Sequence, residues 1–263
     1  MAKKQGPGTA LINFEEEFAK SAKQAVADAK HNIGGGNYFS TKAGVLVFNG
    51  AKCPGNTVAA IIVGSVDTNA FYDGSFDPSN PTGPRCWAIG HGGDLTPGVE
   101  HPINERCKGC PNAEFGSAKD ANGAARKGKA CKNGVRLALV PAGTFSADGR
   151  FEPHSLEQLK DAEIAMLTVP PTSCRAWGAL VQEVSQGFSR PPLGVVTRIH
   201  VEADPVVQFR LEFSVVGKID TKLNALAFEL AEKAKPMLEA PFPDYNPPAA
   251  RPAQPARKAK TKY

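Results

Sequence analysis

One stretch of this sequence, residues 107–131, constrains the fold more than any other: CKGCPNAEFGSAKDANGAARKGKAC. It holds three of the chain's six cysteines and five lysine or arginine residues. The wider segment 91–133 offers few large apolar side chains beyond Leu95, Val99, Ile103 and Phe115. Burying so little apolar surface does not offset the conformational entropy that is lost when a segment of this length becomes ordered. The segment therefore needs another constraint, and its cysteines suggest a metal ion.

The cysteine spacing favours zinc. Cys107 and Cys110 form a C-x-x-C pair, whose two thiolates can reach one ion. Cys131 at the far end of the stretch and Cys86 on a short strand before it are the nearest further ligands, and the four would close a tetrahedral site. A bound zinc ion contributes on the order of 10 kcal/mol at neutral pH, which can order the segment. With all four positions filled, the site is closed to catalysis.

Two alternatives to this ligand set stay open. His91 or His101 could replace one cysteine, and the cysteines could be free or buried thiols without a metal. Cys53 and Cys174 stand apart in the sequence, and we interpret them as small packing residues.

The net charge of +5 comes from one end of the chain. Residues 246–263 carry five basic side chains and no acidic one, and removing these five from 31 leaves 26 basic against 26 acidic residues. Contact with nucleic acid would then depend on local patches. No apolar run is long enough to span a membrane, and the N-terminus lacks the apolar core of a signal peptide. We therefore expect a cytoplasmic protein without a membrane partner.

The apolar patterns predict a mainly β (α+β) fold. Strands are expected within 36–48, 56–66, 70–76, 85–90, 134–143 and 163–169, and a hairpin over 194–217. Helices are expected over 13–31, over 170–188 with Thr172 or Ser173 as its cap, and from 221 towards Pro236. Strands and helices do not alternate, which argues against a parallel doubly wound sheet and favours a small antiparallel barrel with helical additions.

These elements divide the chain into four parts. An N-terminal helical extension (1–32) precedes the barrel domain (33–219), which carries the zinc-binding insertion at 86–133. A C-terminal helix (220–240) follows. Residues 241–263 are rich in Pro, Ala and Lys, a composition typical of a disordered basic tail.

Aromatic residues beside basic ones suggest contacts with single-stranded nucleic acid, because bases stack on rings while cations follow the phosphates. Each aromatic could instead be a core residue, and the cations could form a plain solvated surface. The candidate contacts are Tyr38, Lys42, Tyr72, Trp87, Arg126, Lys127, Lys129, Arg198 and Arg210.

The order of several motifs resembles a family of tailed-phage single-stranded DNA-binding proteins. The similar motifs are IGGGNYFSTKAGVLVF, NTVAAIIVGSVDTNAFYDGSFDP, PRCWAIG, CKGCPNAEFGSA, GKACKNGVRLAL and PPTSCRAWGALV, which together cover about residues 33–215. The resemblance implies an oligonucleotide-binding (OB) barrel with a zinc-bearing insertion, and Cys86, Cys107, Cys110 and Cys131 match the cysteine positions of the family. The basic tail departs from the pattern, because such proteins typically end in an acidic tail.

We therefore expect a sequence-tolerant single-stranded DNA-binding protein without catalytic activity, which coats and protects exposed strands in phage DNA replication or recombination. A phage-encoded chain would work in the host cytoplasm, with phage or host replication proteins as further partners. One alternative is a zinc-containing interaction module that binds host replication or transcription machinery. Another is a metal-dependent nuclease or recombinase subunit, for which Asp67, Asp73 and Asp77 would supply the carboxylates.

Overall fold

The structure confirms a mainly β fold. This computed structural model describes residues 37–74, 82–120, 123–146 and 148–245, together with Phe18 and Ser21. Apart from those two residues, the helix expected over 13–31 lies outside the described part, and so does the chain beyond residue 245. The strands are β1 (Tyr38–Lys42), β2 (Val45–Phe48), β3 (Ala51–Lys52), β4 (Thr57–Phe71), β5 (Cys86–Gly90), β6 (Lys132–Phe145), β7 (Phe151–Pro153), β8 (Ala165–Val169), β9 (Val195–Asp204) and β10 (Gln208–Lys218). The helices of the described residues are α2 (Leu156–Lys160), α3 (Cys174–Phe188) and α4 (Asn224–Leu238).

The strands form one mixed sheet with the order β10-β9-β4-β6-β8-β1-β2-β3. β6 pairs with one edge of β4, while β9 and β5 pair with opposite ends of its other edge, and β7 extends the sheet from β6. The prediction of a wholly antiparallel barrel is wrong at β1 and β8, which are parallel. A parallel pair needs a long connection, and here residues 43–164 connect the two strands. Among the described residues no pairing joins β10 to β3, so the sheet is not closed.

The two central strands, β4 and β6, are buried on both faces. Ile62 and Leu139 lie in a first apolar cluster on one face, and Ile61 and Val140 lie in a second cluster on the other. A strand that is covered on both sides is apolar at successive positions rather than at alternate ones. This burial explains the continuous runs AAIIV in β4 and LALV in β6.

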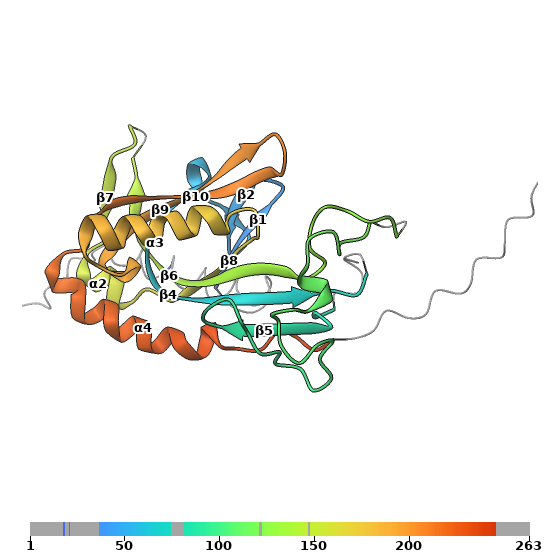
Figure 1. Cartoon of the computed structure of the whole chain (residues 1–263). Helices are drawn as coiled ribbons and strands as arrows, with labels where there is room; N and C mark the ends of the chain where they lie inside the picture. Colours follow the sequence, from blue (N-terminus) through green and yellow to red (C-terminus); the bar gives the residue numbers. More distant parts are fainter. Residues whose placement is uncertain are drawn as a thin grey trace, which may run out of the picture.

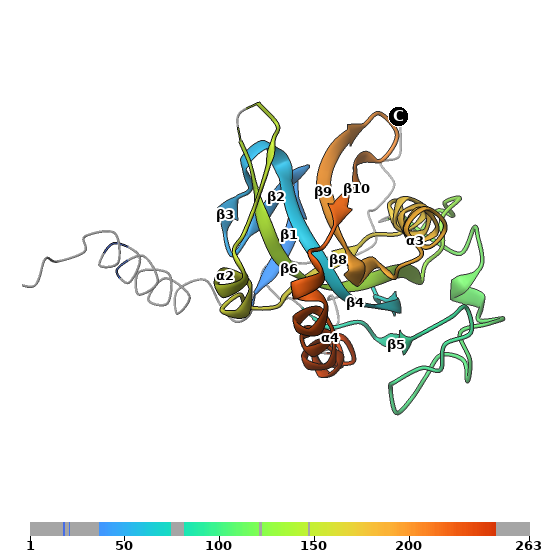
Figure 2. The same cartoon turned by 90° about the vertical axis from the view of Figure 1, so that its left-hand side faces the viewer.

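Helices α3 and α4 cover opposite faces of the sheet (Figure 1). Their apolar sides agree with those that the helical periodicity predicts. The turned view in Figure 2 shows the curvature of the sheet, with strands β1 to β3 on one side and the β9–β10 hairpin on the other. The buried residues of α3 are Trp177, Leu180 and Val184, and those of α4 are Ala227, Leu230, Ala234 and Leu238.

Ser173 occupies the N-cap position of α3, as the sequence predicts, but its hydroxyl does not cap the helix. The Ser173 Oγ instead accepts a hydrogen bond of 2.8 Å from the Leu211 amide of β10. Because Ser173 is fully buried, this bond satisfies two polar groups that water cannot reach. The hydroxyl therefore ties the start of α3 to the sheet.

Residues 241–245, predicted as the start of a disordered tail, are instead packed against the rest of the chain. The Phe242 ring lies 5.8 Å from the Trp87 ring, centroid to centroid. The Gly83 amide donates a hydrogen bond of 3.1 Å to the Asp244 carbonyl. A Pro-rich composition disfavours helices and strands, but it does not prevent one aromatic side chain from docking onto another.

Candidate functional site

The sheet brings Cys86 and Cys131 to one end of β4. Cys86 pairs with Phe71 across one edge of that strand. On the other edge Ala70 pairs with Lys132, which directly follows Cys131. Two cysteines far apart in the sequence thus flank the last residues of the same strand.

The segment between them folds back to place the C-x-x-C pair at the same point. Leu95 is buried, and its carbonyl accepts a hydrogen bond of 3.0 Å from the Cys107 amide. The Cys110 amide donates to the Cys107 carbonyl at 3.3 Å across a tight turn in which Gly109 has a φ of 79°, a conformation that favours glycine. The Cys131 amide donates to the Asn112 carbonyl at 2.7 Å and closes the segment.

All four predicted ligands line one small pocket, whose free volume is about 20 Å³. That is room for roughly one water-sized sphere. Neither His91 nor His101 lines this pocket, and both are exposed. The alternative with a histidine ligand therefore has less support than the set of four thiols. Cys53 and Cys174 pack against the first apolar cluster, which confirms their prediction as packing residues.

The thiols influence each other electrostatically. Burial, together with charge on Cys107, Cys110 or Cys86, raises the pKa of the Cys131 thiol to about 12. Burial also raises the pKa of Cys107, and a hydrogen bond from the Asn69 side chain acts in the opposite direction. Without a metal ion, such a pocket disfavours the presence of several negatively charged thiolates together. A bound dication would favour the thiolate form instead, because thiolates are its ligands.

The donor set fits zinc in chemistry, while the side chains are not arranged as a formed metal site. In the part of the chain that the structure describes, no group of three or more His, Cys, Asp or Glu side chains has that arrangement. Zinc binding by Cys86, Cys107, Cys110 and Cys131 therefore stays a prediction.

Residues 114–120 and 123–132 form a lobe beyond the pocket, which we call the cationic lobe. Backbone hydrogen bonds hold its two arms together, from Arg126 N to Ala118 O (2.7 Å) and from Ala118 N to Gly128 O (3.1 Å). The Ser117 hydroxyl accepts a hydrogen bond of 2.9 Å from the Ala130 amide. Because both ends of the lobe lie at the cysteine pocket, a constraint on the pocket also orders the lobe.

The lobe presents an aromatic ring among cations. The Phe115 side chain is 80% exposed, and the Lys129 Nζ lies 4.9 Å from the centre of its ring. Lys127 is exposed, whereas Arg126 lies 3.9 Å from the Asp120 carboxylate. The sequence analysis did not select Phe115, although it is the one large apolar residue between Cys110 and Cys131. A single aromatic residue within a polar, cationic stretch was the sequence signal that could have identified Phe115 as a candidate contact.

Four of the other predicted contacts lie on strands β1, β9 and β10. Tyr38 on β1 is 59% exposed, and Lys42 ends the same strand. Strands β8, β6 and β4 lie between β1 and the β9–β10 hairpin that carries Arg198 and Arg210. The curvature of the sheet nevertheless brings the β1–β2 turn back towards β10, where a Cβ atom on Gly44 would lie 3.7 Å from the Phe209 Cβ atom. Joint contact of these four residues with one nucleic-acid strand therefore stays a prediction.

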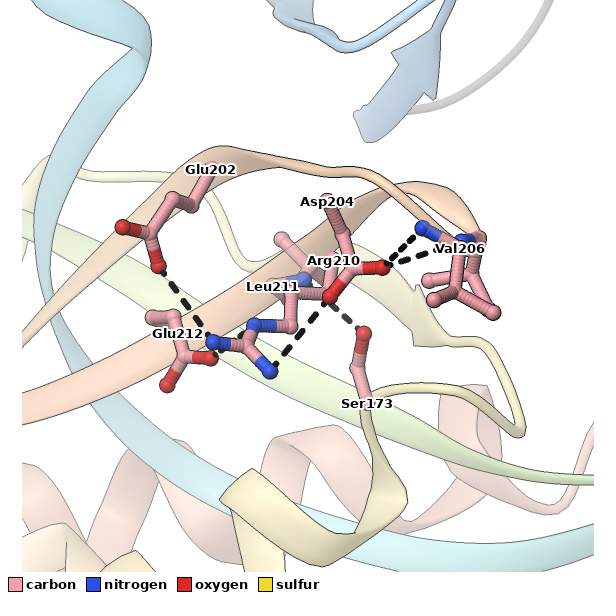
Figure 3. A network of polar contacts seen from close by, with 8 residues as sticks. Ser173, Glu202, Asp204, Val206, Arg210, Leu211 and Glu212 are labelled. Atoms are coloured by element: carbon pink, nitrogen blue, oxygen red, sulfur yellow. Dashed lines mark hydrogen bonds and ion pairs between the residues drawn. The ribbon is translucent and has the colours of Figure 1, made fainter.

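Three carboxylates of the hairpin surround the guanidinium of Arg210 (Figure 3). Its guanidinium lies 2.6 Å from Glu212, 3.5 Å from Asp204 and 3.8 Å from Glu202. Arg198 lies over the Phe145 ring at 5.1 Å. Three carboxylates around one guanidinium leave a net negative charge, which disfavours the contact with phosphate that the sequence analysis predicts for Arg210.

Acid is expected to loosen the β9–β10 turn. Hydrogen bonds from the Val207 and Val206 amides, and then the charge of Arg210, hold the pKa of Asp204 below its ordinary value of 3.8. A depressed folded-state pKa means that the carboxylate stabilises the turn above the unfolded-state pKa, and that this contribution is lost as the pH falls through the folded-state value. We expect the protection of the Val206 and Val207 amides, which is the ratio of the intrinsic to the observed exchange rate, to fall below about pH 4.

Asp204→Asn is the matched control for this expectation. The variant keeps an oxygen acceptor but removes the titrating charge. The protection of its Val206 and Val207 amides should therefore change little with pH in this range. An exchange profile of the unmodified chain that follows only the intrinsic pH dependence would contradict the assignment.

Trp87 and Tyr72 differ in accessibility. Trp87 is half-buried between Phe242 and Gly98, where a Cβ atom on Gly98 would lie 2.3 Å from its ring. Tyr72 follows β4 and is 45% exposed. Of these two predicted stacking residues, Tyr72 offers the more open ring.

The carboxylates proposed for a nuclease are not assembled. Asp67 accepts a hydrogen bond of 3.0 Å from the Gly92 amide, and Asp73 lies 3.7 Å from Arg85. Asp77 lies outside the described residues. The nuclease alternative gains no support from Asp67 and Asp73.

Comparison with known proteins adds no relative. No family model matches the sequence, and neither a curated protein nor a solved structure matches it. None of the described helices is long and apolar enough to cross a membrane. The function has to be argued from the site itself.

Proposed function

We propose that the chain is a sequence-tolerant single-stranded DNA-binding protein whose main contact surface is the cationic lobe. The observation that carries this proposal is the exposed Phe115 ring beside the Lys129 ammonium group. A nucleobase can stack on such a ring while neighbouring ammonium groups meet the phosphates. Between residues 107 and 132, six basic residues stand against two acidic ones, which supports contact with a polyanion.

The remaining parts of the proposal concern the scaffold and its partners. We propose that zinc bound by the four pocket cysteines orders the lobe, and that the curved mainly β sheet is an open relative of the OB-type barrel. The protein would coat exposed strands during replication or recombination without catalysis of its own. Phage or host replication proteins would be its further partners, in the cytoplasm of the host.

Stacking on Phe115 is tested with a labelled oligothymidine, followed by fluorescence anisotropy. Phe115→Ala should weaken binding by about tenfold, since stacking on one ring contributes about 1–3 kcal/mol per base. Phe228→Ala is the matched control, because Phe228 is 60% exposed on α4 and far from the lobe along the chain. An equal loss of affinity in both variants would argue against the cationic lobe as the contact surface.

The phosphate contacts are tested through the salt dependence of the same binding. Replacing Lys127 and Lys129 by glutamine should lower the slope of log affinity against log salt by about 1.4, because each single-strand phosphate contact contributes about 0.7. Tighter binding to a duplex than to the single strand, or no binding to either, would overturn the proposed function. Retention of one host protein by the lobe in the absence of nucleic acid would favour the interaction-module alternative.

A further inference from the structure

A row of side chains on the sheet lies beside the cysteine pocket. Asn69 of β4 pairs with Ala88 of β5 on one side and with Asn133 of β6 on the other. Cys86 stands two residues before Ala88, and Cys131 stands two residues before Asn133. Side chains two residues apart on a strand point to the same face. Asn69 accordingly lines the pocket together with both of these cysteines.

The segment that carries the C-x-x-C pair crosses the same face of the sheet. A Cβ atom on Gly90 would lie 3.2 Å from the Leu95 side chain, and Ala88 is fully buried. These two small residues of β5 leave room for Leu95, whose carbonyl accepts the hydrogen bond from the Cys107 amide. Cys107 is thereby brought to Asn69, and the two side chains are hydrogen-bonded.

Asn133 fixes the orientation of the Asn69 amide. The Asn133 Nδ2 donates a hydrogen bond of 2.6 Å to the Asn69 Oδ1. In an amide side chain the oxygen only accepts and the nitrogen only donates. With its oxygen engaged by Asn133, Asn69 turns its Nδ2 to the Cys107 sulfur. Asn69 is only 8% exposed, so water competes little for this hydrogen bond.

The four pocket cysteines differ in how the fold holds them. Cys86 begins β5 and Cys131 directly precedes β6, so the sheet positions both. Cys107 and Cys110 lie instead on the connecting segment, which has few apolar side chains of its own. Asn69 is a side chain of the central strand β4 that reaches this segment. It can therefore pass the order of the sheet on to one of the two cysteines that lack a strand.

We propose that Asn69 is a positioning residue of the zinc site, whose side-chain N–H holds the Cys107 sulfur in place as a ligand while Asn133 holds Asn69. This inference rests on the zinc site of the proposed function. Groups that hydrogen-bond to metal ligands orient those ligands and tune their donor strength. A hydrogen bond to an ionised acceptor is about twice as strong as one between neutral groups, so the bond favours a thiolate that binds a metal.

The experiment uses the full-length chain and the variant Asn69→Leu, which keeps a side chain of similar size but has no donor. Its affinity for zinc, measured by competition with a chromophoric chelator, should fall by about 10–100-fold. Cobalt(II) is used in place of zinc as a spectroscopic probe. The sulfur-to-cobalt charge-transfer band should move to lower energy, because a sulfur lone pair without its hydrogen bond donates more readily. The tetrahedral ligand-field bands should keep their intensity.

Two further variants separate positioning from a structural role. Asn133→Ala changes an exposed residue and leaves the buried amide in place, so zinc affinity should fall by about threefold, as for the loss of one neutral hydrogen bond. Thr68→Val is the matched control, because Thr68 is a buried polar residue at the preceding position of β4 and points to the opposite face. This control should match the unmodified chain in zinc affinity and in the cobalt spectrum.

The possible results distinguish this inference from the zinc site itself. If Asn69→Leu binds zinc like the unmodified chain and its charge-transfer band does not move, Asn69 does not position Cys107, and the zinc site still stands. If Asn69→Leu loses its ligand-field bands while Asn133→Ala and Thr68→Val are both unchanged, Asn69 is a packing residue and the inference is wrong. An unmodified chain that takes up neither zinc nor cobalt would overturn the zinc site and this inference together.

Discussion

Replacing Cys131 by serine is expected to abolish zinc retention and to release residues 91–131 from the sheet. Cys131 is the most buried of the four pocket cysteines, and β6 begins directly after it. A serine hydroxyl is a far poorer zinc ligand than a thiolate, and three remaining thiolates leave the tetrahedral site open. Because metal binding in such a site is coupled to folding, the segment should lose its order together with the ion.

The measurement combines metal analysis with hydrogen exchange. The unmodified chain should hold about one zinc ion, and Cys131→Ser less than about a tenth of that. Exchange should rise across residues 91–131 and stay unchanged in β4 and in the part of β6 beyond the pocket. Removal of zinc from the unmodified chain with a chelator should produce the same pattern and weaken the binding of oligothymidine.

Cys174→Ser is the matched control. Cys174 donates a hydrogen bond of 3.4 Å to the Pro170 carbonyl, an interaction that a hydroxyl can keep, and it lies outside the pocket. The control should retain its zinc and the order of the segment. A metal-free unmodified chain with a protected segment would contradict both the zinc site and the role we give it.

Local patterns in the sequence predicted the existence of most elements but not their arrangement. The apolar runs in β4 and β6 and the alternation in β10 are local signals, and each of these strands was expected. The pairing of β1 with β8 depends on contacts between residues far apart in the chain, which periodicity does not encode. Helix α2 was missed, although the capping box of Ser155 and Gln158 was a readable signal.

The candidate site, like the fold, was predicted only where the signal is local in the sequence. The cysteine spacing suggested four thiolates around one ion, and all four side chains line one pocket, while their binding of zinc stays a prediction. Arg210 was expected to be an open cation, yet the hairpin register sets it directly opposite Glu202. The contact of Phe242 with Trp87 was not foreseen, because it joins two segments that are distant in the sequence.

Leu139→Ala is expected to lower the stability of the protein substantially. Leu139 is fully buried, and it is paired with Ile62 of β4 on one side and with Ala165 of β8 on the other. Strands held by backbone bonds on both sides cannot collapse into the space left by the side chain. The free energy of unfolding should therefore fall by about 3 kcal/mol, within the usual range of about 2–5.

Urea denaturation measures this loss, with Phe228→Ala as the exposed control, for which we expect a change below about 0.5 kcal/mol.

The position of Leu139 also allows the stability contributed by the core to be measured separately from that contributed by the zinc site. Eight residues of strand place Leu139 about 27 Å from Cys131. At that distance the effects of Leu139→Ala and Cys131→Ser should add within about 0.5 kcal/mol when the global unfolding of the sheet is followed. A strong departure from additivity would mean that the pocket and the core unfold as one unit, and that the cysteine segment is part of the sheet's cooperative structure rather than a separately ordered attachment.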